Sequence, residues 1–206
     1  MVGWLQTTFS NKKTTSIALL VSIWSYQVHS FIHAYVKYSA PHESKVPATG
    51  LSLFSDGPFY TWGTSEDEFN RSLEYLAKYC QENGPFDGVY GFSLGVSIIT
   101  ALSHPSIWRD RLKLKCCPWN FAILGCGGGS KMLGNLSSDI TIDLPSFHIF
   151  GAKDNLLKDS QALEMYWISS KKGNYTHERG HAIDMDLCRR EKDLACLLND
   201  FLKTYK

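Results

Sequence analysis

The chain has 206 residues, of which 44% are hydrophobic and 20% are charged, an ordinary composition for a globular domain. Its 21 basic and 20 acidic residues leave a formal net charge of +1. This even balance, without a basic stripe, excludes the charge pattern of nucleic-acid-binding proteins. Since no repeat, low-complexity tract or linker divides the sequence, we expect a single domain over residues 1–206.

The six cysteines show no metal-binding pattern, because no CxxC pair occurs among them. Most of them lie among apolar residues, which favours reduced, buried thiols and a reducing compartment. We therefore expect a cytoplasmic protein, with the nucleus as an alternative location. Neither a metal nor another cofactor is expected.

The first apolar segment, residues 16–24, reads SIALLVSIW and follows Lys12 and Lys13. It is too short to span a bilayer, so no membrane span is expected. Its apolar residues recur at helical spacing, at Ile17, Leu20, Val21 and Trp24. This spacing predicts a core helix. The less favoured interpretation is the core of a secretion signal, with a weak cleavage site at Val28-His29-Ser30.

The next elements lead to a capped helix. Residues 31–38 are expected to form a short strand, and residues 51–63 a loop rich in aromatic residues, glycine and proline. Ser65 and Glu68 stand three residues apart, as in a capping box, so a helix should begin after Ser65. Its apolar residues share one face, at Phe69, Leu73, Leu76 and Cys80. Gly84, followed by proline, ends it.

The rest of the chain alternates between strands and helices. Strands are predicted at residues 87–92, 120–125, 146–151 and 174–177, and helices at residues 95–103, 160–169 and 190–205. Such alternation is typical of a parallel sheet with helices on both faces, so we expect an α/β fold.

A candidate nucleophile lies where the first of these strands meets its helix. Residues 91–95 read Gly-Phe-Ser-Leu-Gly, which fits the G-x-S-x-G pattern. In that pattern a serine sits on a sharp strand-to-helix turn, and the glycines leave room for the turn. The helix that follows directs its free amides toward developing negative charge. A chance match in a loop is the alternative, but the strand and helix on either side favour Ser93 as nucleophile.

A serine nucleophile needs a histidine base and an acid that orients the base. On this architecture the acid and then the histidine follow the serine along the chain. Asp154 directly follows the strand at residues 146–151 and is the expected acid, although it could instead cap a surface turn. The rivals Asp143 and Asp159 do not directly follow that strand.

The expected base is His181, which follows Gly180 and precedes the last helix. His177 is its rival, but its place at the end of a strand favours a structural role. His104 and His148 are also expected to be structural, because a lone histidine usually is.

The glycine-rich run at residues 125–130, Gly-Cys-Gly-Gly-Gly-Ser, could suggest a phosphate-binding loop. It lacks the G-K-[ST] ending of a P-loop and the full G-x-G-x-x-G fingerprint. We interpret it as a flexible loop at the edge of the sheet where α/β sites form, where it can help to shape a pocket.

With these residues in place, the chain resembles the FSH serine hydrolases, a group with the α/β-hydrolase fold. Its ENGPFDGVYGFSLG resembles the family segment E-N-G-P-F-D-G-(apolar)2-G-F-S-Q-G, with Leu94 in place of glutamine. DLPSFHIFGAKD and HERGHAID resemble the segments that carry the family's acid and base, with Arg179 for a glycine and Asp184 for a proline. YSAPHE resembles the segment after an early strand.

The resemblance continues to the start of the chain, where MVGWLQ is similar to the family's L-H-G-(aromatic)-x-Q, with Val2 in place of histidine. It implies that the backbone amides of Trp4 and Leu94 form an oxyanion hole. Almost all of the strand that precedes this motif is missing or incomplete. That strand belongs inside the sheet, so its absence should leave ladder groups on its neighbours unpaired. We therefore expect an incomplete gene product or a degenerate paralogue.

The resemblance implies a serine hydrolase of small carboxylic esters or thioesters that needs no cofactor. Ser93, His181 and Asp154 would be its catalytic residues. Aromatic residues could line an acyl pocket or simply pack in the core: Phe54, Phe59, Tyr60 and Trp62. An impaired relative that binds a small acyl ligand or a partner protein is the alternative, and a peptidase is a third.

Overall fold

The computed structural model describes residues 21–24, 29–32, 36–37, 60–134, 136, 141–183, 187 and 190–205. Residues 21–24, 29–32, 36–37, 60–61 and 169 are described by their backbone alone. Its main sheet has six strands: β1 Val21–Trp24, β2 His29–Ile32, β5 Gly88–Phe92, β6 Phe121–Gly125, β7 Ser146–Gly151 and β8 Lys172–His177. They are arranged in the order β2-β1-β5-β6-β7-β8. β5 to β8 are parallel, whereas β1 is antiparallel to both of its neighbours.

Among the described residues, four helices and three helical turns have bounds that the structure defines. The helices are α1 Glu66–Asn83, α2 Leu94–Ser103, α3 Leu157–Glu164 and α5 Lys192–Tyr205. The turns are Ser106–Arg111, Ser130–Leu133 and Ser169–Lys171, and a separate antiparallel pair joins β3 Val36–Lys37 to β4 Tyr60–Thr61. Within these ranges, no helix has both the length and the apolar character needed to cross a bilayer.

The predicted capping box forms at the start of α1. The Ser65 hydroxyl accepts a hydrogen bond from the Glu68 N–H at 3.4 Å. The Glu68 carboxylate accepts from both the N–H and the hydroxyl of Thr64, each at 2.8 Å. These hydrogen bonds lower the pKa of Glu68. The helix ends as predicted at Gly84, whose N–H donates to the carbonyl of Cys80.

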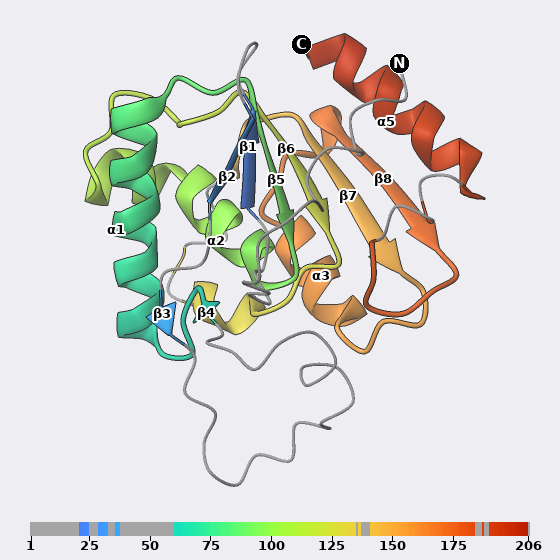
Figure 1. Cartoon of the computed structure of the whole chain (residues 1–206), viewed down its shortest axis with the longest axis horizontal. Coiled ribbons are helices and arrows are strands. Elements are labelled where there is room, and N and C mark those ends of the chain that lie inside the picture. The colour runs from blue at the N-terminus through green and yellow to red at the C-terminus, as the bar shows by residue number, and fades with distance from the viewer. Residues whose placement is uncertain are drawn as a thin grey trace, which may run out of the picture.

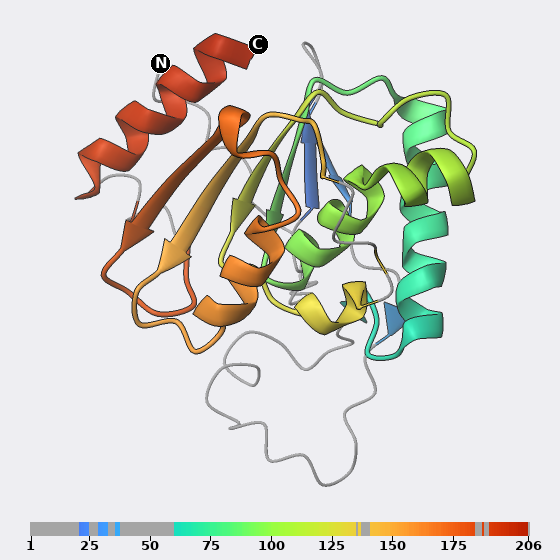
Figure 2. The same ribbon diagram turned by 180° about the vertical axis from the view of Figure 1, so that it is seen from behind.

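Helices cover both faces of the sheet, as the strand pattern predicts (Figures 1 and 2). Val89, Ala122 and Leu124 pack with α1 and α2 in one cluster. The alternate residues of the strands point to the other face, where they pack with α5 in a second cluster: Phe121, Ile123, Phe147 and Ile149. Phe201 of α5 makes edge contacts there with Phe121 and Phe147, with ring centroids 5.9 and 5.6 Å apart.

The helix predicted around residues 17–24 is wrong over Val21–Trp24, which forms β1. The remaining positions, Ile17 and Leu20 among them, lie outside the described residues. A short apolar run fits a strand buried on both faces as well as a core helix, and the β-branched Val21 and Ile23 favour the strand. Within the strand predicted at 31–38, β2 ends at Ile32 and β3 covers Val36–Lys37.

β1 also changes what was expected beside the nucleophile strand. It pairs with β5 from Val21 opposite Gly91 to Trp24 opposite Gly88. β5 therefore has a partner on each edge, and the prediction of unpaired ladder groups is wrong for this strand. Residues 1–20, which carry the resemblance to the family's opening motif, lie outside the described residues.

One later element is shifted from its predicted place. The helix expected at 160–169 is α3, which runs from Leu157 to Glu164. It ends early because the backbone beyond it pairs with Ile142. The Ile142 N–H donates to the Tyr166 carbonyl, and the Ile168 N–H donates to the Ile142 carbonyl. Sequence periodicity cannot show such a bridge, since its two sides are distant along the chain.

Candidate active site

Ser93 occupies the sharp turn between β5 and α2, with φ 56° and ψ −126°. A positive φ is strained for a residue with a side chain, and such strain is characteristic of functional turns. Gly91 is required beside it, because a Cβ there would lie 2.4 Å from the Ile99 side chain and 3.0 Å from the Gly95 backbone. The Ser93 N–H donates to the Gly125 carbonyl at 3.0 Å, which fixes the turn to β6.

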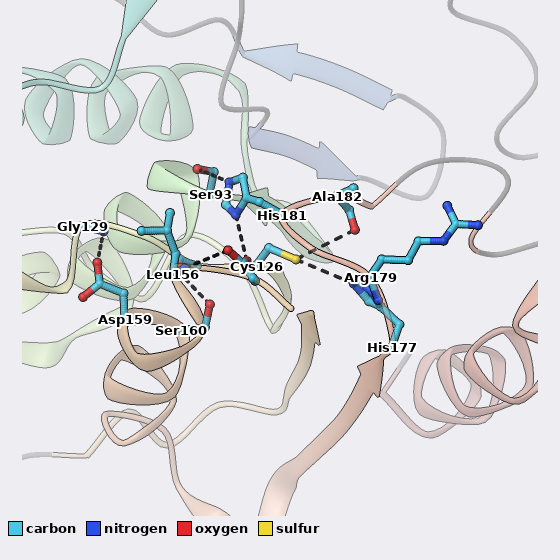
Figure 3. Close-up of polar contacts among 12 residues, drawn as sticks. Ser93, Cys126, Gly129, Leu156, Asp159, Ser160, His177, Arg179, His181 and Ala182 are labelled. Atoms are coloured by element: carbon cyan, nitrogen blue, oxygen red, sulfur yellow. Dashed lines mark hydrogen bonds and ion pairs between the residues drawn. The ribbon is translucent and has the colours of Figure 1, made fainter. Parts of the chain in front are cut away.

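The structure brings together the three side chains that the sequence predicts as a triad. Figure 3 shows Ser93 and His181 facing each other. The Nε2 atom of His181 lies 2.9 Å from the Ser93 hydroxyl, and its Nδ1 atom lies 2.8 Å from the Asp154 carboxylate. Because the carboxylate can only accept when ionised, Nδ1 carries the proton of the neutral ring. Nε2 is then the acceptor that faces the Ser93 hydroxyl.

Asp154 is held firmly in this arrangement. Its side chain is fully buried, and its second carboxylate oxygen accepts from the Leu156 N–H at 2.8 Å. The His181 ring packs against Phe92, with ring centroids 4.9 Å apart, while part of its side chain remains exposed. Asp154 is thus buried, and the partly exposed ring of His181 lies between Asp154 and Ser93.

Of the two amides expected in the oxyanion hole, the structure describes only that of Leu94. Leu94 is the first residue of α2, where an N–H has no partner within its own helix. It directly follows Ser93, so its amide stands at the positive end of α2 beside the hydroxyl. Trp4 lies outside the described residues.

The glycine-rich loop packs against the nucleophile turn. The Gly128 N–H donates to the Ser93 carbonyl at 3.1 Å. Side chains from the helices bind the loop in turn: Ser160 donates to the Gly127 carbonyl at 2.7 Å, and Ser97 donates to that of Gly128. Although it was interpreted as flexible, this loop is anchored at consecutive peptides.

The rival acids have other partners. Asp159 accepts from the Gly129 N–H at 3.1 Å and from the Ser130 hydroxyl, so it holds the glycine loop (Figure 3). Asp143 forms an ion pair with Lys171 at the surface. From the sequence, Asp159 is only an alternative acid of the triad. Its position on α3 does not predict that its carboxylate binds the glycine-rich loop.

His104, His148 and His177 are buried in structural settings, as expected. His104 contacts the Ser106 hydroxyl after the end of α2. His148 contacts the Ser146 hydroxyl, and burial lowers the pKa of its ring to about 3. His177 ends β8, and its Nδ1 atom accepts from the Arg179 N–H at 3.2 Å.

Sequence reasoning missed one residue at this site, Cys126. Its ligand atom and those of Asp154 and His181 all lie within 4.8 Å of one another, a set that could in principle hold a metal ion. Burial, together with the Asp154 charge, raises the pKa of the Cys126 thiol to about 12. In this structure the other two members of the set are engaged with each other and with Ser93, as a triad.

The chain is similar to a family of known hydrolases and to several esterases. The family model described as Serine hydrolase (FSH1) matches residues 2–187. Esterase FPY3 of Fusarium mangiferae is 30% identical over 170 residues, which cover 75% of each chain. Esterase C25G4.2 of Caenorhabditis elegans is 25% identical over 197 residues, 89% of this chain and 83% of that protein.

A Schizosaccharomyces pombe hydrolase is 33% identical over 96 residues, but the match covers only 22% of that longer protein and 46% of this chain. The family match, by contrast, extends over most of this chain, and the parallel strands β5 to β8 carry the serine turn in the way of an α/β hydrolase. This chain is therefore a member of the serine hydrolase (FSH1) family, with the α/β-hydrolase fold.

Proposed function

We propose that this serine hydrolase cleaves carboxylic esters or thioesters of small acyl groups, with Ser93 as nucleophile, His181 as base and Asp154 as orienting acid. The observation that supports this most directly is the continuous series of contacts, 2.9 Å from Ser93 to His181 and 2.8 Å from His181 to Asp154. The names of the two esterase relatives favour ester substrates.

The first half of the reaction forms an acyl-enzyme. His181 Nε2 removes the hydroxyl proton as Ser93 Oγ attacks the acyl carbonyl. The Asp154 carboxylate stabilises the imidazolium that forms, because it lies against Nδ1 in a buried setting. His181 then gives its proton to the departing alcohol or thiol, which leaves the acyl group bonded to Ser93.

The second half releases the acid. A water molecule takes the place of the leaving group and gives a proton to His181 as it attacks the acyl carbon. The tetrahedral intermediate collapses, His181 returns the proton to Ser93, and a free carboxylic acid departs. His181 passes on each proton within the same half-reaction, to the leaving group in the first and to Ser93 in the second, so the cycle involves no cofactor.

The negative oxygen of each tetrahedral intermediate needs hydrogen-bond donors. The Leu94 N–H stands beside Ser93 at the start of α2 and is the proposed first donor. The family resemblance proposes the Trp4 amide as the second. Loss of one such donor typically lowers the rate by about 10²–10³-fold.

Labelling and hydrolysis together test this function. A fluorophosphonate probe should label the wild-type chain, and the chain should hydrolyse p-nitrophenyl butyrate and a butyryl thioester. Ser93→Ala should abolish labelling and turnover, and His181→Ala should reduce both severely, whereas Ser170→Ala, at an exposed serine, should change neither. Labelling that survives Ser93→Ala would remove Ser93 as nucleophile, and a folded wild-type chain without turnover would contradict the proposed activity.

A further inference from the structure

Cys126 lies directly behind the proposed triad. It follows β6, while Asp154 follows β7 and His181 follows β8, so adjacent parallel strands bring all three to one edge of the sheet. The Cys126 N–H donates to the Ile149 carbonyl at 2.8 Å, which ties its backbone to β7. This register places the cysteine beside the acid.

The side chain is directed inward by an unusual backbone. Cys126 has φ 45°, a left-handed value that a residue with a side chain rarely adopts. It is the one residue of 125–129 that is not glycine, and it is fully buried. Its Sγ atom lies within 4.8 Å of ligand atoms of Asp154 and His181 and 4.0 Å from the Ala182 carbonyl.

A second histidine sets the direction of hydrogen bonding around this sulfur. His177 Nε2 lies 3.8 Å from Cys126 Sγ, and both residues are buried (Figure 3). The other ring nitrogen, Nδ1, accepts from the Arg179 N–H. The neutral ring of His177 therefore carries its proton on Nε2, where it points toward the sulfur as a weak donor.

The thiol has one proton to donate. Its raised pKa keeps that proton in place at neutral pH. Two acceptors lie near the sulfur: the Ala182 carbonyl at 4.0 Å, and the Asp154 carboxylate within 4.8 Å, whose interaction with the thiol contributes to its raised pKa. A charged acceptor forms the stronger hydrogen bond. Because His177 faces the sulfur as a donor, the S–H can turn only toward these two acceptors, and the charge of Asp154 favours the carboxylate.

We propose that Cys126 is a positioning residue, whose thiol donates to the Asp154 carboxylate and holds it in the orientation that His181 requires. The Leu156 amide and the His181 ring already contact Asp154, and the Cys126 thiol is the third donor in this proposal. This inference rests on the proposed function, because the orientation matters only if the triad reacts.

The first test reads the Asp154–His181 hydrogen bond without using activity. The Nδ1 proton of His181 should give a far-downfield proton resonance in the wild-type chain, assigned by its loss in His181→Ala. In Cys126→Ala it should broaden and move upfield, and Cys126→Ser, which keeps a donor, should retain it. Cys80→Ala is the matched control, since it truncates another buried cysteine with a thiol pKa near 12, on α1.

The second test measures ester hydrolysis by the same variants. Cys126→Ala should lower kcat about tenfold with KM within twofold, the effect expected from loss of one weak hydrogen bond to a charged group. Cys126→Ser should recover most of the rate, and Cys80→Ala should be unchanged.

An unaltered His181 resonance in a folded Cys126→Ala variant would overturn the positioning role, as would equal kinetic losses in Cys126→Ala and Cys80→Ala. Failure of the proposed function itself would look different. The wild-type chain would then turn over no ester, while the His181 resonance would still report whether Cys126 orients Asp154.

Discussion

The Nε2 atom of His181 lies 2.9 Å from the hydroxyl of Ser93, although 88 residues separate the two along the chain. The contact depends on the parallel sheet, since β5 delivers the serine and β8 delivers the loop that carries the histidine. Parallel strands place their carboxyl ends at one edge, which is where α/β proteins build their sites. The fold thereby brings distant polar residues into hydrogen-bonding range.

Asp154→Asn should lower kcat for ester hydrolysis by about 10³–10⁴-fold while the protein stays folded. The amide can still accept from the Leu156 N–H, but it can also donate to His181 Nδ1 and so favour the wrong tautomer. Steady-state kinetics with a p-nitrophenyl ester measure the effect.

Asp159→Asn is the matched control, because that carboxylate binds the glycine loop instead of the histidine. It should stay within about tenfold of the wild-type rate, the scale of a supporting hydrogen bond. Equal losses in Asp154→Asn and Asp159→Asn would contradict the assignment of Asp154 as the acid.

Gly91→Ala should destabilise the protein by about 1–3 kcal/mol, as overpacking of a dense core does. The new methyl would lie 2.4 Å from Ile99 and 3.0 Å from the Gly95 backbone, so the turn that carries Ser93 must shift. Urea denaturation measures the free energy of unfolding, and the rate of fluorophosphonate labelling measures the reactivity of Ser93.

Gly134→Ala offers a control for Gly91→Ala, since its added methyl would meet only a carbonyl oxygen at 3.3 Å, with an ordinary helical φ of −55°. Labelling of Gly91→Ala at the wild-type rate would show that the turn tolerates a side chain there. In that case the proposed steric reason for this glycine would be wrong.

Much of the site could be predicted because its signals are local. The Gly-x-Ser-x-Gly turn, the aspartate after a strand and the histidine before the last helix each depend on neighbours in sequence, and Ser93, Asp154 and His181 do come together. Cys126 and Asp159 could not be assigned in this way. Their roles depend on contacts across neighbouring strands and beneath a loop, which spacing along the chain does not encode.

The fold also has elements that local sequence predicts and elements that depend on contacts between distant segments. The parallel strands and the capped helix α1 follow from alternation and from the Ser65 and Glu68 pair. β1 was predicted as a helix, because a short apolar run satisfies both periods and the choice depends on which strand edges are free. The end of α3 depends on the bridge at Ile142, another contact that only the folded chain supplies.

Ile23→Pro should destabilise the protein by at least about 1–2 kcal/mol, because β1 lies inside the sheet. β1 pairs on both edges, so each of its N–H groups faces a neighbouring strand, and proline removes one such donor. Ile23→Val keeps the N–H and the branched side chain and serves as control. Equal urea midpoints for the two variants would place residue 23 outside the ladder.

Acid should destabilise this protein through His148. Burial, and secondarily the charge of Lys172, lowers the pKa of its ring from 6.5 to about 3 in the folded state. Between pH 6.5 and about pH 3, His148 therefore binds a proton in the unfolded chain but not in the folded chain. The contribution of His148 to the free energy of unfolding should be constant above pH 6.5. It should fall as the pH drops toward 3, by about 1.4 kcal/mol per pH unit at most. His148→Gln cannot titrate, so urea denaturation from pH 7 to pH 4.5 should show a shallower loss than in the wild type. Parallel curves for the two proteins would exclude His148 as a source of acid sensitivity.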